Sequence, residues 1–110
     1  MKRYFPALPV SAFEGDCLRG VEVAGRQILI ARVCGEFFGA SNICPHAGSP
    51  LSMGRLAGTI VQCSLHGIRF RLSDGKVVGA AACGALPVYR TRVKDGIVEV
   101  EIPDSVLKKP

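Results

Sequence analysis

Two short segments in the middle of the chain, Cys44-Pro45-His46 and Cys63-Ser64-Leu65-His66, each carry one cysteine and one histidine. Sixteen residues separate the segments, which contain both histidines of the chain. If all four side chains bind the same metal centre, the fold has to bring two loops together. Thiolate and imidazole donors in this number suit either a mixed-ligand iron–sulfur cluster or a structural zinc ion.

The distribution of the four donors distinguishes these two centres. Zinc fingers usually place two cysteines in one arm and two histidines in the other. Here each arm is mixed, which favours a diiron cluster with two thiolates on one iron and two neutral imidazoles on the other. Because imidazole donates less negative charge than thiolate, such a cluster is easier to reduce than an all-cysteine cluster.

The composition indicates one small domain built of short strands. A chain of 110 residues corresponds to a single domain, 1–110. Its 13 glycines and 7 prolines, together with the lack of any helical hydrophobic period, favour strands joined by tight turns. We therefore expect an all-β fold, an antiparallel sandwich or open barrel, that carries the loops with the cysteines and histidines.

The end of the chain predicts a hairpin with a defined register. Asp95-Gly96 belongs to the strongest class of two-residue hairpin turns and separates the strand-like segments 88–93 and 97–102. Counting outward from this turn places Arg92 opposite Glu99 on a polar face, whereas the other face is apolar. A shift of one residue would mix the two faces, so the register is well specified.

The same count pairs Arg90 with Glu101 and Tyr89 with Ile102. Apolar or β-branched segments also flank three earlier turn candidates. These predicted turns lie at 24–27, at Cys34-Gly35 and at 73–75.

The charge and the cysteine content exclude several classes of protein. The net charge is +5, but the basic residues are spread along the chain, unlike the clustered basic surface of a nucleic-acid-binding domain. Five cysteines is an odd number, which argues against a disulfide framework, so we expect Cys17, Cys34 and Cys83 to be free thiols. Two prolines interrupt the apolar run 4–13, and no signal peptide or membrane span is expected. These features indicate a cytoplasmic protein.

The residues around the four candidate ligands resemble a known family. The sequence is similar to the Rieske family, and specifically to the Rieske ferredoxins that serve bacterial ring-hydroxylating oxygenases. The segment 81–93 is similar to the loop and strand that cover the cluster in that family. The positions that follow the family pattern are Cys44-Pro45-His46, Leu51, Gly54, Cys63, His66-Gly67, Phe70 and Gly75.

The resemblance implies one [2Fe–2S] cluster per chain as the cofactor. It implies that Cys44 and Cys63 bind the inner ferric iron, and that His46 and His66 bind the outer iron through Nδ1. It also implies a larger antiparallel base and a small cluster-binding subdomain, at about 42–80, formed by the two ligand loops.

One departure from the wider family concerns the reduction potential. In respiratory-complex Rieske proteins, each ligand loop carries a further cysteine and the two form a disulfide, but the corresponding positions here are Ser49 and Leu65. The bridge cannot form, and Leu65 supplies no hydroxyl group near the cluster. Hydrogen bonds to the sulfurs stabilise the reduced cluster, because it carries more negative charge. With fewer such bonds, the reduced cluster is less stable. We therefore predict a potential of about −150 mV, near the low end of the Rieske range.

The rest of the chain indicates an electron carrier rather than an enzyme. Once His46 and His66 are ligands, no histidine is left for a mononuclear iron site, and no G-x-G-x-x-G nucleotide motif occurs. We expect a monomeric ferredoxin that takes single electrons from a reductase and passes them to a terminal oxygenase. Two alternatives stay open: a small subunit of a larger enzyme such as an assimilatory nitrite reductase, and a structural zinc-binding domain.

Overall fold

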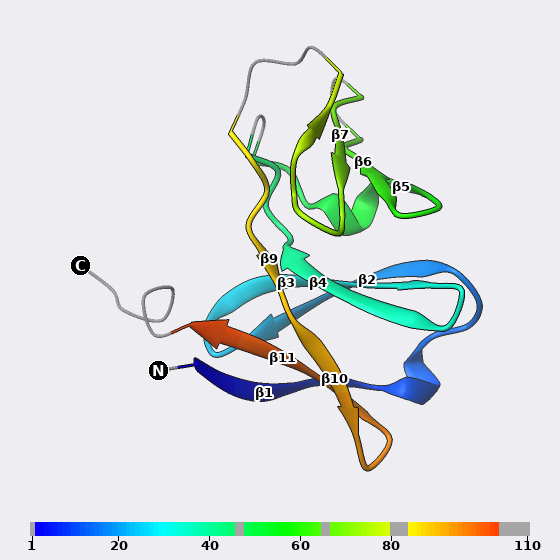
Figure 1. The fold of residues 1–110 in the computed structure, drawn as a ribbon, viewed down its shortest axis with the longest axis vertical. Coiled ribbons are helices and arrows are strands. Elements are labelled where there is room, and N and C mark those ends of the chain that lie inside the picture. The colour runs from blue at the N-terminus through cyan, green and yellow to red at the C-terminus, as the bar shows by residue number, and fades with distance from the viewer. Residues whose placement is uncertain (1, 46–47, 65–66, 80–83, 104–110) are drawn as a thin grey trace.

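The computed structural model of the chain describes residues 2–45, 48–64, 67–79 and 84–103. These residues form three antiparallel sheets stacked along the long axis of the molecule (Figure 1). The described part contains no α-helix, and its only helical elements are the short 3₁₀ turns Val10–Ala12 and Leu51–Met53. The predicted all-β fold is therefore confirmed.

The first sheet has the order β1 (Lys2–Pro9), β11 (Ile97–Pro103), β10 (Thr91–Lys94). The second sheet has the order β2 (Cys17–Val23), β3 (Arg26–Val33), β4 (Glu36–Ser41), β9 (Val88–Tyr89). The third sheet has the order β5 (Arg55–Ala57), β6 (Ile60–Gln62), β7 (Arg69–Arg71), β8 (Val77–Val78).

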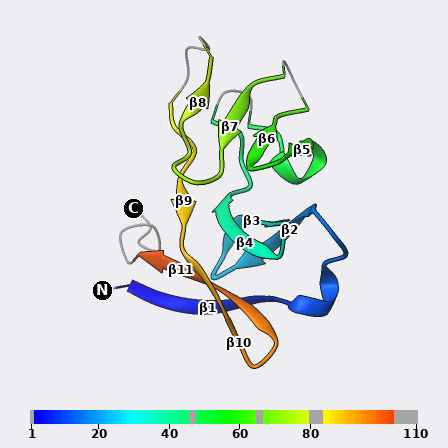
Figure 2. The ribbon, with the colours of Figure 1, turned by 45° about the vertical axis from the view of Figure 1, so that its right-hand side comes forward.

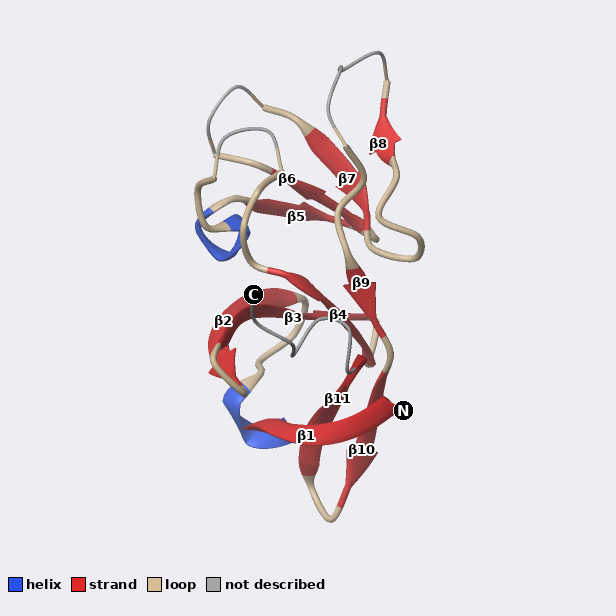
Figure 3. Ribbon diagram, turned by 90° about the vertical axis from the view of Figure 1, so that its left-hand side faces the viewer, coloured by secondary structure: helices blue, strands red, loops and turns tan. Residues whose placement is uncertain are grey.

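Strand β3 is central because both of its faces are buried. Ile28 and Ile30 belong to a base core shared with the first sheet, whereas Leu29 and Ala31 belong to a second core shared with the third sheet. A strand that is covered on both faces reads as a continuous apolar run, as 28–31 does. The second sheet therefore lies between the two cores (Figure 3).

The second core is called the cysteine core below, because it contains both predicted cysteine ligands. Its buried members are Leu29, Ala31, Val33, Ala40, Cys44, Leu51, Val61, Cys63, Phe70, Leu72 and Leu86.

Two predicted hairpins join β2 to β3 and β3 to β4. The β3–β4 turn is Cys34-Gly35, as predicted, with φ angles of +49° and +81°. Positive φ at both positions is the type I′ pattern that suits the twist of paired strands. The β2–β3 turn is shorter than the predicted 24–27, because Val23 pairs with Arg26 and leaves only Ala24-Gly25 between the strands.

The terminal hairpin has the predicted register along β10. Arg92 pairs with Glu99, and Arg92 Nε donates a hydrogen bond to Glu99 Oε1 at 2.6 Å. The backbone N–H of Glu101 also donates to the carbonyl of Arg90 at 2.8 Å. The polar face of the hairpin therefore forms as the sequence predicts.

The hairpin does not extend to the predicted pair of Tyr89 and Ile102. Tyr89 lies in β9 and pairs with Gly39 of β4, so the chain leaves the second sheet and enters the first between β9 and β10 (Figure 2). The Gly39 position is crowded, since a Cβ there would lie 3.0 Å from the Tyr89 carbonyl oxygen. The crossing depends on this close approach of two strands, which the sequence of the hairpin alone does not encode.

Strand β1 is not among the predicted strands. It pairs with β11 along 2–9, with an irregular register between Pro6 and Leu8. Because β1 is an edge strand, it tolerates the prolines that interrupt its apolar run. The N-terminal segment is therefore part of the first sheet.

Two further predictions concern cysteines and membranes. Cys17 and Cys34 form no disulfide, as predicted, whereas Cys83 lies outside the described residues. No helix in the described ranges is long and apolar enough to cross a membrane.

Candidate metal centre

Two loops of equal length, 44–49 and 63–68, begin with the predicted cysteine ligands. In each loop the backbone N–H of the cysteine donates to the carbonyl of the last loop residue, at 2.9 Å in the first loop and 2.7 Å in the second. The residue before the last is a glycine in both, with φ of +73° at Gly48 and +67° at Gly67, which favours glycine over other residues. Each segment is therefore closed by a matching hydrogen bond, from the cysteine at its start to the residue five positions later.

Both cysteines lie inside the cysteine core. Cys44 is 1% exposed and Cys63 is 2% exposed. The segment before β9 contributes Leu86 to the same core, whereas residues 80–83 of the predicted covering loop lie outside the described residues. Both cysteines are therefore buried mainly among apolar residues, and Cys63 also lines a recess of about 430 Å³ together with Arg55 and Gln62.

Ser49 links the two loops. Its Oγ lies 3.1 Å from Sγ of Cys63, within hydrogen-bond distance for a sulfur atom. Ser49 is the last residue of the first loop, and its carbonyl accepts the hydrogen bond from the N–H of Cys44. One residue therefore contacts both cysteine positions, through its backbone at one and its side chain at the other.

The two predicted histidine ligands, His46 and His66, lie outside the described residues. Among the residues that are described, no three His, Cys, Asp or Glu side chains come together as a metal site. The structure therefore places Cys44 and Cys63 in one core, and each of them begins the loop in which a predicted histidine ligand falls.

The donor chemistry of this site fits a [2Fe–2S] cluster. Two thiols and two imidazoles are soft or borderline donors, which iron–sulfur clusters and zinc accept. The buried residues of the cysteine core include no carboxylate, whereas a magnesium or calcium site would need several oxygen donors. The geometry around the cysteines alone leaves the choice between iron and zinc open.

Asn42, a residue not singled out in the sequence, fixes the start of the first loop. It is 5% exposed, and its backbone N–H donates to the carbonyl of Gln27 in β3 at 2.9 Å. Its side chain accepts from the backbone N–H of Ser52 at 2.8 Å and donates to Ser52 Oγ at 3.1 Å. The loop that contains Cys44 is thus held to the second sheet at one end and to the Leu51–Met53 turn at the other.

We expect the free energy of unfolding of the Asn42→Ala variant to be about 1–3 kcal/mol lower than that of the wild type, because the partly buried N–H of Ser52 loses its acceptor. Thermal unfolding of the cluster-loaded protein, followed by the visible absorbance, measures this loss. Ser41→Ala is the control: Ser41 accepts a hydrogen bond from the N–H of Ile43 at an exposed site, so its loss should change stability by less than about 0.5 kcal/mol. Equal effects of the two substitutions would contradict this role of Asn42.

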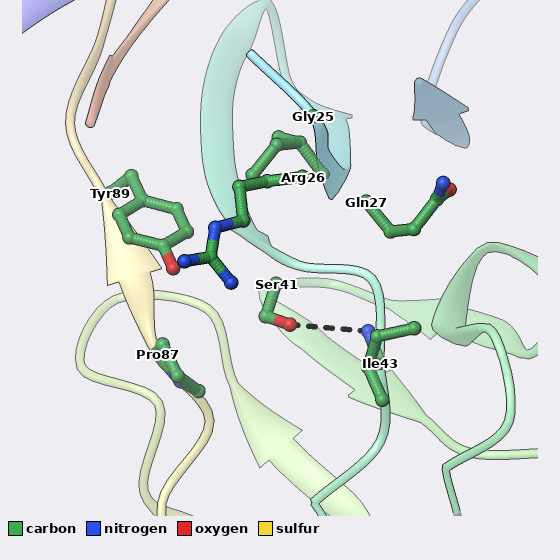
Figure 4. Close-up of a pocket in the computed structure, with 8 residues that line it drawn as sticks. Gly25, Arg26, Gln27, Ser41, Ile43, Pro87 and Tyr89 are labelled. Atoms are coloured by element: carbon green, nitrogen blue, oxygen red, sulfur yellow. Dashed lines mark hydrogen bonds between the residues drawn. The ribbon is translucent and has the colours of Figure 1, made fainter. Parts of the chain in front are cut away.

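A recess of about 490 Å³ lies beside the first loop, where the β2–β3 turn approaches β9. Arg26 extends toward the Tyr89 ring in this recess, and Ser41 and Ile43 line the opposite side (Figure 4). Burial raises the pKa of Tyr89 above its usual value of 10.0, and the positive charge of Arg26 offsets part of that rise. The recess contains none of the predicted ligands.

The raised pKa of Tyr89 predicts a loss of stability at alkaline pH. The folded protein holds the phenolic proton more tightly than the unfolded chain does, so stability is complete below about pH 10 and falls as the pH rises further. The Tyr89→Phe variant should lose less thermal stability than the wild type between roughly pH 9 and pH 11. The same substitution at Tyr4, the other tyrosine of the chain, is the control. Parallel pH curves for wild type and Tyr89→Phe would contradict the prediction.

Comparison with known proteins decides between iron and zinc. The family model of the Rieske [2Fe-2S] domain matches residues 3–90. The ferredoxin component of a naphthalene 1,2-dioxygenase system from Pseudomonas putida is 32% identical over 89 residues, which is 81% of this chain and 85% of that protein. The ferredoxin component of biphenyl 2,3-dioxygenase from Rhodococcus jostii is 34% identical over 92 residues, which is 84% of this chain and 85% of that protein.

Solved structures agree with these sequence matches. A ferredoxin of Sphingomonas yanoikuyae has the same fold, with a TM-score of 0.84 and 24% identity over 92% of this chain and all (100%) of that one. A chain from the complex of reduced oxygenase and oxidised ferredoxin in carbazole 1,9a-dioxygenase matches with a TM-score of 0.81 and 26% identity, over 88% of this chain and 91% of that one.

The fold and the two cysteine-led loops define a small all-β domain of the metal-binding class. The chain belongs to the Rieske [2Fe–2S] family, and its match to the two ferredoxin components named above covers 85% of the length of each. The predicted resemblance, the Rieske fold and the [2Fe–2S] cofactor are therefore confirmed. The protein is a Rieske ferredoxin, an electron carrier, which sets aside both the zinc-binding domain and the small enzyme subunit.

Proposed function

We propose that this ferredoxin binds its cluster through Cys44, His46, Cys63 and His66, in a subdomain of about 42–80. The observation that carries the proposal is the pair of matching closed loops, each of which begins with a buried cysteine of the same core. The mixed Cys and His content of the two segments supports the inclusion of both histidines. The remainder of 1–110 forms the base of this single domain.

The bound cluster would supply reversible one-electron chemistry. The chain's own residues perform three tasks for it: two loops fix the donor positions, the cysteine core keeps the two cysteines largely buried, and Asn42 anchors the first loop. We expect a reduction potential of about −150 mV, near the low end of the Rieske range. A redox titration that gave a value above about +100 mV, far up that range, would contradict this.

We propose that the electron donor is a reductase and that the acceptor is the terminal oxygenase of an aromatic-ring dioxygenase system. The ferredoxin components of the naphthalene and biphenyl systems, and the oxygenase–ferredoxin complex of carbazole 1,9a-dioxygenase, support this assignment. Beside the ligand loops, Ile43 is 43% exposed and Met53 is 73% exposed, and no charged residue occurs from 44 to 53. Such a small uncharged surface suits the brief contacts of electron-transfer partners.

The expected carrier is a monomer in the cytoplasm, with protein partners and no nucleic-acid or membrane partner. The free thiols of Cys17 and Cys34 support a reducing compartment. The spread of basic residues along the chain argues against a nucleic-acid partner. Gel filtration of the cluster-loaded protein tests both expectations. Alone, the protein should elute as a monomer, and with a candidate oxygenase it should still elute separately because the complex is transient.

The proposed ligation is tested by EPR spectroscopy of the dithionite-reduced protein, together with its iron content. We expect a rhombic signal whose average g value lies well below that of all-cysteine clusters, because imidazoles replace two thiolates. Reduction of the protein by a dioxygenase-system reductase, followed by reoxidation on addition of an oxygenase, tests the partners. A colourless protein with tightly bound zinc would overturn the ligand assignment.

A further inference from the structure

We propose that the Ser49 hydroxyl is a tuning group of this ferredoxin, which donates a hydrogen bond to the Cys63 sulfur and raises the reduction potential. The inference rests on the proposed ligation by Cys63. It starts from the 3.1 Å separation of Ser49 Oγ and Cys63 Sγ, which joins the end of one ligand loop to the start of the other.

The direction of this hydrogen bond follows from the chemistry of the ligand. In a protonated thiol, either Cys63 or Ser49 could donate. A cysteine sulfur bound to iron carries no proton, so in the loaded protein the Ser49 O–H is the donor and the sulfur is the acceptor. The bond is then charge-assisted, because the sulfur carries negative charge.

The backbone around Ser49 holds the hydroxyl in this position. The Ser49 carbonyl accepts the N–H of Cys44 at 2.9 Å, and the next residue, Pro50, forms a β-bridge with Ile43. Proline also restricts the backbone of the residue that precedes it. The serine side chain therefore extends from a backbone fixed on both sides, and little of the hydrogen-bond energy is lost to ordering it.

The effect on the potential has a defined sign. Reduction adds one electron, and hence one negative charge, to the cluster and its ligands, whereas the O–H bond of Ser49 stays intact and no proton moves there. A hydroxyl dipole whose positive end faces the sulfur stabilises the reduced state more than the oxidised state. Because Cys63 is 2% exposed, bulk water screens this dipole only weakly. Removal of the hydroxyl should therefore lower the potential.

The experiment compares substitutions that separate hydrogen bonding from packing. Ser49→Thr keeps the hydroxyl, and Ser49→Val has nearly the same shape as threonine without it; Ser49→Ala removes the hydroxyl and adds no bulk. At the midpoint potential of the wild type, we expect the ratio of reduced to oxidised protein to be about tenfold lower in Ser49→Ala and in Ser49→Val. This ratio corresponds to a midpoint potential that is lower by about 59 mV for one electron. In Ser49→Thr, the ratio of reduced to oxidised protein at the same potential should stay within about twofold of the wild-type ratio. Ser73→Ala, at an exposed turn, should not shift the midpoint.

The midpoint is measured by voltammetry, and the EPR spectrum and iron content confirm that each variant carries the cluster. Equal shifts for Ser49→Thr and Ser49→Val would overturn the proposal, because packing would then explain them. An unchanged midpoint in Ser49→Ala would overturn it as well, as would loss of the cluster in both Ser49→Ala and Ser49→Val, since the hydroxyl would then serve assembly. A wild type without a Rieske EPR signal would instead refute the proposed ligation itself.

Discussion

Replacing Cys63 with alanine is expected to give a protein without the visible colour and the rhombic EPR signal of the wild type. Under the proposed ligation, the inner iron would lose one of its two thiolates, at a position that is 2% exposed. Substitutions that only touch the residues around a metal ligand already reduce metal affinity by roughly 10- to 100-fold, so loss of a ligand should reduce it by more. Iron analysis and the EPR amplitude after purification measure the effect. Cys44→Ala should behave in the same way.

The chain contains its own control for this experiment. Cys34 is an exposed thiol in the β3–β4 turn, at the opposite end of β4 from the first ligand loop and outside the cysteine core. Cys34→Ala should keep the iron content and EPR spectrum of the wild type. If Cys63→Ala retained a full Rieske signal, or if Cys34→Ala lost it, the assignment of the cysteine ligands would be wrong.

The parts of the fold that could be predicted are those that local chemistry determines. The Cys34-Gly35 and Asp95-Gly96 turns have residues that accept positive φ, and the pairing of Arg92 with Glu99 follows by counting from the second turn. The apolar run 28–31 is likewise a local signal of a buried strand. Once a turn fixes the first residue pair, the hydrogen bonds between the two strands fix the pairing of the residues that follow.

The parts that could not be predicted depend on contacts between distant segments. The prolines of β1 obscure its strand pattern, and only its pairing with β11 at the sheet edge makes it a strand. The crossing from β9 to β10 depends in the same way on the close approach of Tyr89 to Gly39. No pattern within either segment carries that information.

The site shows the same division between local and distant information. The spacing of Cys44 and Cys63 relative to the histidines marks them as candidate ligands in the sequence itself. From the sequence, Ser49 showed only that the disulfide of respiratory-complex Rieske proteins is absent. Its contact with Cys63 could not be predicted, because the two residues lie in loops that follow different strands. The hydrogen bonds between Asn42 and Ser52 could not be predicted either, because no sequence motif around Asn42 indicates them. The four ligands could therefore be proposed from the sequence, whereas the polar contacts around the two cysteines could not.

Gly75, in the turn between β7 and β8, supports the site through the segment that follows β8. It is buried, with φ of +76°, and its carbonyl accepts the backbone N–H of Leu86 at 2.8 Å. A Cβ at this position would overlap the carbonyl oxygen of Leu86, a backbone atom that cannot rotate away. Leu86 is 1% exposed and packs in the core that contains Cys44 and Cys63, so a displaced Leu86 would open that core.

Gly75→Ala should therefore destabilise the loaded protein far more than a strained turn alone would. Gly96 is the matched control, because its φ of +75° is nearly the same and no atom lies within 4 Å of an added Cβ. Gly96→Ala should cost about 1–2 kcal/mol for the left-handed conformation, whereas Gly75→Ala adds an overlap that costs about 1–3 kcal/mol more. A further 2 kcal/mol would lower the thermal midpoint by roughly 8–16 °C in a domain of this size. Faster bleaching of the cluster in Gly75→Ala than in Gly96→Ala would show that the displaced segment protects the site. Equal midpoints and equal bleaching rates would mean that the 84–87 segment can move without exposing the cysteines.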